Sequence, residues 1–304
     1  MPTELLSNIL SGLMSRYRER VPDVGRVLEI MHSNSLIQNE SDIENDHIAF
    51  RTLGVPNLGI ASLEKVFLHC GYERRDSYQF EKKKLNAFWY APPLGTFPRV
   101  FISELRVGEL SAQAQEIITG YTAAIKSDPV DSLNLDDAAA VDNFLHSPLW
   151  QLPAWKDFER LQSESEYAAW VIYNRYYLNH FTISVHNLPT PFNTVDRFNQ
   201  LLEANGIRLN DAGGKIKTSP DGLLIQSSTV AQTVEAEFRS DGDETEKHSI
   251  AGSYVEFAER RLLPEYQHLG PAASTRSHRR EGFEAGNADK IFESTFTDQI
   301  QRDN

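Results

Sequence analysis

The order of predicted secondary-structure elements repeats along this chain. Within residues 41–108, "DHIAFRT" predicts a strand, "VPNLGIASLEKVFLHCGY" a helix, and "YQFEKKKLNAFWYAPP" and "RVFISELRV" three further strands. The same order of strand, helix and strands recurs over residues 179–264, although residue-level similarity between the two units is weak. A repeated order of elements is the signature of an architecture built from one unit. The sequence therefore predicts an α+β protein made of two similar units.

The second unit begins with "NHFTISVH" as a strand, and "NTVDRFNQLLEANGI" follows as a helix. "GGKIKTSPDGLLIQSSTVAQTVEAEF" predicts hairpin strands with a turn at "SPDG", and "SYVEFAERR" closes the unit. Helical patterns predict N-terminal helices over residues 1–40 and a helical insertion over residues 109–178, while residues 265–304 form a C-terminal extension. We therefore predict a single domain over residues 1–304.

Charge and hydropathy exclude two classes of partner. The net charge is -13 and the sequence pI is about 5.2, so we expect neither nucleic acid nor an anionic membrane as the main partner. No window reaches the roughly 20 apolar residues of a membrane helix. The N-terminal "MPTELLSNILSGLMSRYRERVP" predicts an amphipathic helix and not a signal peptide. The one cysteine, Cys70, ends an apolar helix, which predicts a buried thiol and a cytoplasmic or other reducing compartment.

The strand "DHIAFRT" carries polar side chains on one face. Side chains alternate along a strand, so His47, Ala49 and Arg51 point one way, while Ile48 and Phe50 point the other. The second set is apolar and suits a core. The first set predicts a polar face turned toward a cavity.

A histidine opens the first strand of each unit. In "NHFTISVH", His180 shares its face with Thr182, Ser184 and His186, and Glu256 lies on the last strand of the second unit. Two histidines and one carboxylate from three strands would fill three positions of a metal ion and leave others open, as in non-haem iron(II) enzymes. Singly, each residue is commonly a packed or ion-paired side chain, so the prediction depends on the matched positions. His186 is six residues beyond His180, too far to bind the same ion.

These motifs together resemble a known family. "DHIAFRT", "NHFTISV" and "YVEFAERR", with "ESEYAAWVIYNRYYLNH" and the C-terminal "REGFEAGNADKIFEST", are similar to the 2-oxoadipate dioxygenase/decarboxylase family, the hydroxyglutarate synthases, over nearly the whole chain. "YVEFAERR" also resembles the glutamate-bearing end of 4-hydroxyphenylpyruvate dioxygenase and hydroxymandelate synthase. The resemblance implies the vicinal-oxygen-chelate fold, in which paired βαβββ modules form a curled mixed or antiparallel sheet around a metal.

The resemblance also implies a reaction. It is that of an Fe(II)-dependent dioxygenase/decarboxylase of lysine catabolism, which converts 2-oxoadipate and O2 to 2-hydroxyglutarate and CO2. His47, His180 and Glu256 match the metal ligands, and Arg51 matches the substrate-binding arginine. Arg51 lies roughly 13 Å along the strand from His47, within reach of the far carboxylate of a chelated six-carbon diacid. Its planar fork can pair that carboxylate in a bidentate way.

Two serines are further candidates for substrate contact. Ser184 lies on the strand face of His180, and Ser294 lies in the C-terminal "FEST", which we expect to close over the substrate.

Alternative interpretations remain for two charged residues. By pseudo-symmetry, Glu104 is expected to occupy in the first unit the place of Glu256 in the second, which makes it a candidate fourth ligand. A four-ligand site would indicate a non-redox glyoxalase-type isomerase or lyase using zinc or nickel. The alternative for Arg51 is a structural salt bridge with Glu104 or Asp46. A metal-free binding protein on the same fold is the third functional alternative.

Overall fold

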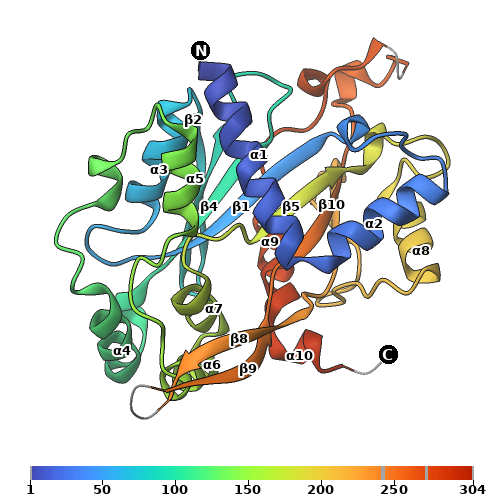
Figure 1. Cartoon of the computed structure of the whole chain (residues 1–304). Coiled ribbons are helices and arrows are strands. Elements are labelled where there is room, and N and C mark those ends of the chain that lie inside the picture. The colour runs from blue at the N-terminus through green and yellow to red at the C-terminus, as the bar shows by residue number, and fades with distance from the viewer. Residues whose placement is uncertain (1, 241–243, 271–272, 303–304) are drawn as a thin grey trace.

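The computed structural model describes residues 2–240, 244–270 and 273–302. Two units with the predicted order of elements form its centre (Figure 1). The elements of the first unit are β1 (Asn45–Leu53), α3 (Ile60–His69), β2 (Glu73–Phe80), β3 (Leu85–Ala91) and β4 (Arg99–Leu105). The elements of the second unit are β5 (His180–Ser184), α8 (Val195–Ala204), β6 (Lys217–Thr218), β7 (Leu224–Ser228) and β10 (Tyr254–Arg260). The predicted repetition and the α+β class are confirmed.

The two units share one eight-stranded mixed sheet, with the strand order β2-β3-β4-β1-β5-β10-β7-β6. β1 and β5 pair antiparallel at the centre of the sheet. On either side, each of these strands pairs in parallel with the last strand of its own unit, β4 or β10. The strand order is therefore symmetric: replacing each strand by its counterpart in the other unit gives the same order read from the opposite edge. The strands that carry His47 and His180 are therefore direct neighbours.

One predicted strand of the second unit lies outside this sheet. The segment "TVEAEF" forms β8 (Thr233–Arg239), which pairs antiparallel with β9 (Thr245–Ala251) in a separate two-stranded sheet. This hairpin is inserted between β7 and β10 and extends toward α6 (Trp155–Glu164) (Figure 1). Phe238 of β8 packs on Trp155 and Phe158 of α6. Hydrophobic contact with the helical insertion, which a local pattern does not reveal, therefore explains why this strand leaves the main sheet.

Helices cover the sheet on the side opposite to the two histidines. The N-terminal helices α1 (Pro2–Arg20) and α2 (Pro22–Ser33) cross this side of the sheet (Figure 1). Tyr17 of α1 packs on Phe181, whose side chain points away from that of its neighbour His180. The region between the units forms α4 (Ala112–Thr122), α5 (Ala138–His146), α6 and α7 (Glu166–Asn174).

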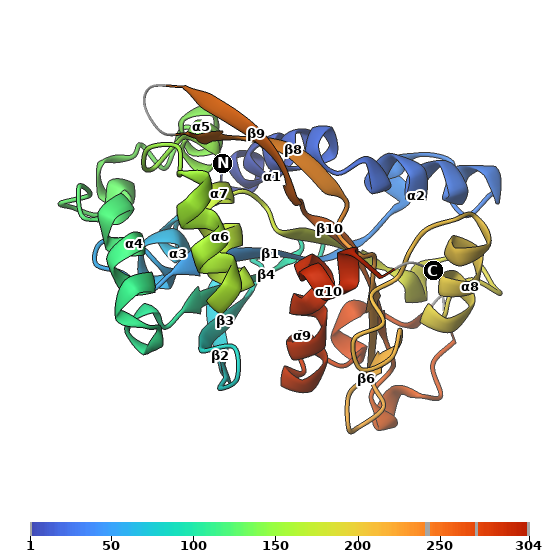
Figure 2. The ribbon, with the colours of Figure 1, turned by 90° about the horizontal axis from the view of Figure 1, so that it is seen from below.

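The C-terminal segment occupies the open side of the curled sheet. It forms α9 (Ala285–Ile291), the 3-10 turn η8 (Phe292–Thr295) and α10 (Thr297–Ile300). α9 contacts β2 at one edge of the sheet and both β6 and β7 at the other. Figure 2 shows α9 between these edges, below the central strands. The two ends of the sheet are therefore bridged by a segment that follows both units in the sequence.

The central strand β1 is buried on both faces. Phe50 packs on Phe67 of α3, at a ring-centroid distance of 5.4 Å, so the apolar face of the strand contributes to the core as predicted. His47, Ala49 and Arg51 are also buried, and their face is the concave face beneath α9. Among the described residues, no helix has the length and apolar character needed to cross a membrane.

Candidate metal centre

Three adjacent strands bring His47, His180 and Glu256 together. In the antiparallel pair of β1 and β5, His180 lies opposite Ala49, so it shares the face of His47. In the parallel pair of β5 and β10, Tyr254 is the partner of His180, and Glu256 follows two residues later on the same face. The three side chains therefore converge because strand pairing aligns them, although they are far apart in the sequence.

The donor atoms of these side chains form a compact buried triangle. His47 Nε2 lies 3.3 Å from His180 Nε2 and 3.4 Å from Glu256 Oε2, and His180 Nε2 lies 3.1 Å from the same carboxylate oxygen. Donors about 2.1 Å from a common ion would subtend roughly 95° to 108° at these separations, which suits three adjacent ligand positions. Among the described residues, this is the one cluster of three His, Cys, Asp or Glu side chains that could hold a metal ion. The donor set therefore fits the predicted metal.

Polar neighbours orient each of the three donors. His47 Nδ1 is 2.8 Å from Asp46 Oδ1, and His180 Nδ1 is 3.1 Å from Asn179 Oδ1. Hydrogen bonds from both Nδ1 atoms point both Nε2 atoms into the triangle, where the Nε2 of each neutral ring keeps a lone pair for a metal. Gln226 Nε2 donates to Glu256 Oε1 at 2.6 Å, which leaves Oε2 in the triangle.

Asp46 is itself held by two buried arginines. Arg260 donates to its carboxylate from Nε at 2.6 Å and from Nη2 at 2.9 Å, and Arg99 Nη1 lies 3.2 Å from Oδ2. Burial would raise the pKa of Asp46, but Arg260 and Arg99 hold it well below its usual range. An ionised Asp46 accepts a hydrogen bond from His47 Nδ1–H and thereby sets the tautomer of that ring.

Burial and electrostatic attraction shift the pKa values of the three side chains in opposite directions. Burial would raise the pKa of Glu256, but the charge of His47 and hydrogen bonds from both histidines lower it to about 2. Burial lowers the pKa of His180, and Glu256 opposes this shift only in part. The pKa of His47 is raised because attraction to Glu256 and the bond to Asp46 outweigh its burial. An ionised carboxylate and a neutral His180 are the forms that bind metals.

A small, mostly apolar cavity adjoins the triangle. Phe101 of β4 and Phe283 form part of its wall, and the C-terminal segment contributes Ala288, Ile291 and Phe292. Tyr254 and Gln226 complete the lining beside the three donors. The segment that bridges the sheet edges therefore also covers the candidate metal site and restricts access of water to it.

Arg51 lies on the same concave face and is 1% exposed, and like the two serines described below it is not among the residues that line the cavity. Its Nη1 donates to Thr295 Oγ1 at 2.9 Å and its Nη2 to the Phe292 carbonyl at 3.0 Å. The guanidinium also lies over the rings of Tyr167 and Trp170. No salt bridge joins it to a carboxylate within the described residues, so the proposed pairs with Glu104 and Asp46 do not form there.

The two predicted serine contacts lie away from the cavity lining. Ser184 Oγ donates to Glu44 Oε1 at 3.2 Å, near the start of β1. Ser294 Oγ lies 2.8 Å from Ser228 Oγ and accepts a hydrogen bond from Asn210 Nδ2 at 2.9 Å. Ser294 therefore anchors the C-terminal segment to β7, which keeps the neighbouring Phe292 over the cavity.

The expected equivalence of Glu104 and Glu256 is wrong. β4 pairs with β1 so that His47 faces Arg99 and Ala49 faces Phe101. Superimposing this register on the pair of β5 and β10 places Phe101, and not Glu104, at the position of Glu256. Glu104 is an odd number of residues further on and points to the other face, where its Oε2 accepts the N–H of Ile60 at the start of α3.

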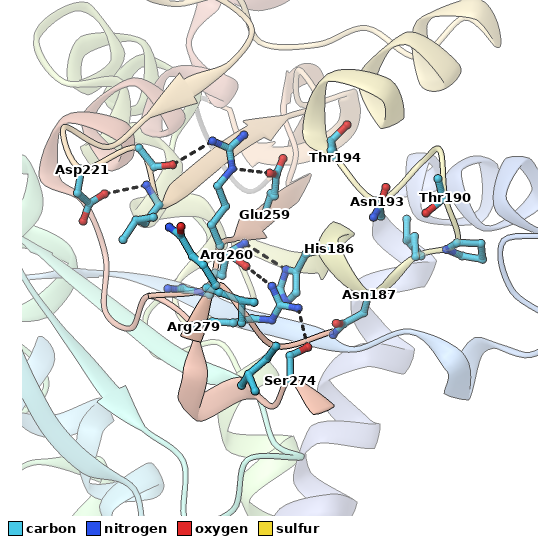
Figure 3. A pocket seen from close by; sticks show the side chains of 18 residues that line it. His186, Asn187, Thr190, Asn193, Thr194, Asp221, Glu259, Arg260, Ser274 and Arg279 are labelled. Carbon is cyan, nitrogen blue, oxygen red and sulfur yellow. Dashed lines mark hydrogen bonds and ion pairs between the residues drawn. The ribbon is translucent and has the colours of Figure 1, made fainter. Parts of the chain in front are cut away.

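A larger and more open groove lies at the end of β10, beside the loop that follows β5 (Figure 3). His186 lies there, as a histidine outside the metal triangle, and its Nδ1 accepts the backbone N–H of Arg260 at 3.2 Å. Arg279 donates to the Arg260 carbonyl at 2.7 Å, and the Arg260 side chain turns inward to Asp46. The groove therefore lies behind Asp46, while the converging donor atoms belong to the smaller cavity.

The sequence motifs do not single out four further residues of this site: Asp46, Arg260, Gln226 and Tyr254. Asp46 directly precedes His47 in "DHIAFRT", so the common pairing of a ligand histidine with a carboxylate could have identified it. Tyr254 shares the strand face of Glu256 and could have been found by the same alternation. Arg260 shares that face too, but its contact with Asp46 and that of Gln226 with Glu256 join distant segments, and such contacts carry no local signal.

Paired βαβββ units around a buried two-histidine, one-carboxylate triangle define a protein of the vicinal-oxygen-chelate type with a site able to bind a metal. The family model described as 2-oxoadipate dioxygenase/decarboxylase (HGLS) matches residues 9–269. The chain belongs to this family, which confirms the resemblance found in the sequence.

Individual relatives agree with this membership. The chain is 44% identical to the chloroplastic 2-oxoadipate dioxygenase/decarboxylase of Arabidopsis thaliana, over 97% of this chain and 78% of the relative. It is 41% identical to the hydroxyglutarate synthase of Oryza sativa, solved in complex with 2-oxoadipate, with a TM-score of 0.87 over 99% of this chain and 95% of that one. A Ralstonia eutropha structure described as belonging to the glyoxalase superfamily is 21% identical, with a TM-score of 0.75 over 94% and 88% of the chains, and shares the fold.

Proposed function

We propose that this chain is an Fe(II)-dependent dioxygenase/decarboxylase that converts 2-oxoadipate and O2 to 2-hydroxyglutarate and CO2. The observation that carries the proposal is the buried triangle of two histidine nitrogens and one carboxylate oxygen, with separations of 3.1–3.4 Å, beside a covered cavity. Two histidines and one carboxylate are the donor set typical of non-haem iron(II) oxygenases. The names of the relatives supply the substrate, 2-oxoadipate.

His47, His180 and Glu256 would hold the metal. Bound there, iron(II) supplies the redox chemistry with dioxygen and open positions for the 2-oxo acid. Asp46 and Asn179 keep the two Nε2 atoms available, and Gln226 fixes the carboxylate. Because these contacts hold the donors in place before an ion arrives, little reorganisation is needed on binding.

Arg51 would bind the far carboxylate of the substrate. Its guanidinium is buried on the face of the triangle, four residues from His47, and forms no salt bridge among the described residues, although the charge of Glu166 acts on it from further away. A buried cation without a counter-ion is costly, so an anionic substrate group is a favourable partner. Ser184 and Ser294 bond to Glu44 and Ser228, and their contact with the substrate stays a prediction.

The phenylalanines of the cavity would limit water near the reacting carbons. Phe101, Phe283 and Phe292 come from three separate parts of the chain and line the space beside the donors. Excluding water strengthens polar interactions inside the site and protects reactive species from side reactions.

The compartment and the pathway belong to the same proposal. The single cysteine is buried, which suits a cytoplasmic or other reducing compartment, and lysine breakdown is implied by the family. Two curated relatives are described as chloroplastic proteins.

Oxygen uptake by the anaerobically iron-loaded protein tests this function. We expect 2-oxoadipate to stimulate oxygen consumption, with one CO2 and one 2-hydroxyglutarate formed for each O2 used. Zinc-loaded protein is the control and should consume no oxygen. An iron-loaded protein that binds 2-oxoadipate but consumes no oxygen with it, or with any of a series of 2-oxo acids, would contradict the proposal.

A further inference from the structure

Two of the buried polar groups without a hydrogen-bond partner belong to side chains on the concave face that carries the metal triangle. They are the Tyr254 hydroxyl and the Arg51 Nε, each without a partner in the described part of the chain. Tyr254 is 0% exposed and Arg51 is 1% exposed, so solvent does not satisfy either group. Buried donors are almost always paired in native proteins, because an unpaired one loses its hydration without compensation. The two groups together therefore indicate where a ligand with several acceptor atoms would bind.

Strand pairing aims Tyr254 at the cavity. Tyr254 is the cross-strand partner of His180, and their ring centroids lie 4.8 Å apart. It is one of the residues that line the cavity beside the triangle. Its hydroxyl and the Arg51 guanidinium also face each other, and their attraction opposes the effect of burial on the pKa of both groups, although no hydrogen bond of good geometry joins them. Tyr254 therefore connects the metal triangle with the buried arginine.

The C-terminal segment determines which side of Arg51 is left for a ligand. Both terminal nitrogens of Arg51 donate to η8: Nη1 to Thr295 Oγ1 and Nη2 to the Phe292 carbonyl. A guanidinium has five N–H donors, so the two bonds to η8 leave three, and Nε–H with an N–H of one terminal nitrogen can form a parallel pair. Nε is the atom without a partner. The free edge of Arg51 and the Tyr254 hydroxyl thus provide three N–H or O–H donors.

We propose that Tyr254 determines specificity for 2-oxo dicarboxylic acids, its hydroxyl and the Nε edge of Arg51 jointly binding the substrate carboxylate farthest from the metal triangle. This assignment rests on the proposed function and adds a residue to its site. A carboxylate has two oxygens and about four lone-pair directions, so it can accept from all three donors. A substrate that ends in a methyl group would leave the same donors unpaired, and would bind weakly for that reason.

The test compares Tyr254→Phe with the unaltered iron-loaded protein on two substrates. 2-Oxoadipate carries the far carboxylate, and 2-oxohexanoate has the same length but ends in a methyl group. For Tyr254→Phe we expect kcat/KM with 2-oxoadipate to fall on the order of 10- to 100-fold, mainly through KM, as for loss of a hydrogen bond to a charged group. With 2-oxohexanoate we expect a change of less than about twofold. Anaerobic calorimetry should show the same selective loss in the Kd of 2-oxoadipate.

Tyr176→Phe is the matched control. Tyr176 is 2% exposed, and its hydroxyl also has no partner within the described residues, but the side chain is not part of the cavity lining. Removing that hydroxyl should leave kcat/KM unchanged for both acids. Iron content and the melting temperature, measured for each variant, separate a substrate effect from loss of metal or of folded protein.

Four outcomes would overturn the assignment. Equal losses on both acids would mean that Tyr254 acts through its ring, for example by packing on His180. No loss on either acid would mean that its hydroxyl does not touch the substrate, and loss of iron would make it a support of the metal site. An unaltered protein that neither binds nor turns over 2-oxoadipate would overturn the proposed function and this assignment with it. If the unaltered protein turns over 2-oxoadipate normally but Tyr254→Phe does not discriminate between the two acids, the assignment of Tyr254 is wrong and the proposed function stands.

Discussion

Asp46 and His47, adjacent in the sequence, form a buried hydrogen bond of 2.8 Å between Oδ1 and Nδ1. Both side chains are almost fully buried, and the carboxylate is held in turn by Arg99 and Arg260. The bond directs the second ring nitrogen of His47 into the metal triangle. A charged network that spans β1, β4 and β10 therefore fixes the geometry of one metal ligand.

We expect Asp46→Asn to weaken metal binding by about 10- to 100-fold, the range found when the partner of a ligand histidine is removed. An amide does not carry the charge that fixes the His47 tautomer, and Arg99 and Arg260 lose their buried counter-ion. Competition with a chelator measures the affinity. Asp131→Asn, which alters an exposed carboxylate paired with Lys65, is the control and should bind metal normally.

We expect iron binding to need all three residues of the metal triangle. His180→Ala and Glu256→Ala should each lose most of the bound iron, because two remaining donors hold iron(II) poorly. His186→Ala provides the comparison, since His186 is a half-buried histidine outside the triangle. Metal analysis after anaerobic loading measures all three variants. Full iron occupancy in His180→Ala would exclude the three-ligand site.

Glu104 should contribute to stability and not to metal binding. Its Oε2 accepts the N–H of Ile60 at the N-terminus of α3, 2.8 Å away. Glu104→Ala should lower the free energy of unfolding by about 1 kcal/mol, as expected for a lost acceptor at a helix N-terminus. Urea denaturation measures this change, and iron content should remain that of the unaltered protein. Iron loss as severe as in Glu256→Ala would instead revive the four-ligand interpretation.

Arg51 should show a selective and a general effect when it is replaced. Arg51→Ala should lower kcat/KM for 2-oxoadipate on the order of 10- to 1000-fold, because a charged partner of the far carboxylate is lost. A smaller loss is expected with 2-oxohexanoate, since Arg51 also holds the C-terminal segment through Phe292 and Thr295. Arg51→Lys should restore part of the difference, because an ammonium keeps the charge but not the fork. Steady-state kinetics on both acids measure the two effects, and equal losses on both would make Arg51 structural.

Cys70 should resist alkylation in the folded protein. Its side chain is buried, and burial raises the pKa of the thiol to about 11. At pH 8 only about one thiol in a thousand would be ionised, and the thiolate is the reactive form. Ionisation, and with it reactivity, rises only as the pH approaches the raised pKa. Mass spectrometry after iodoacetamide treatment should find modification in urea but not in buffer, and rapid labelling of the folded protein would contradict the burial.

The sequence by itself determined the repeated order of strands and helices and the side-chain face of each strand residue. These properties depend on spacing within a few residues, because side chains alternate along a strand and apolar residues recur at helical intervals. The same local rules set His47 and Arg51 on one face of β1 and identified His180 at the start of the second unit. The motifs also indicated the family, and the match of its family model to residues 9–269 confirms this membership.

Only the tertiary structure decided which side chains meet. The register between β1 and β4 removed Glu104 from the site and set Phe101 opposite Ala49, and the sequence of one strand does not specify its register with another. Arg51 meets Thr295, and Asp46 meets Arg260, across more than two hundred residues of sequence. The separate β8–β9 hairpin and the cover provided by α9 likewise depend on contacts between distant segments. Such contacts form because the curled sheet brings its two edges to one C-terminal segment, a geometry that no local pattern encodes.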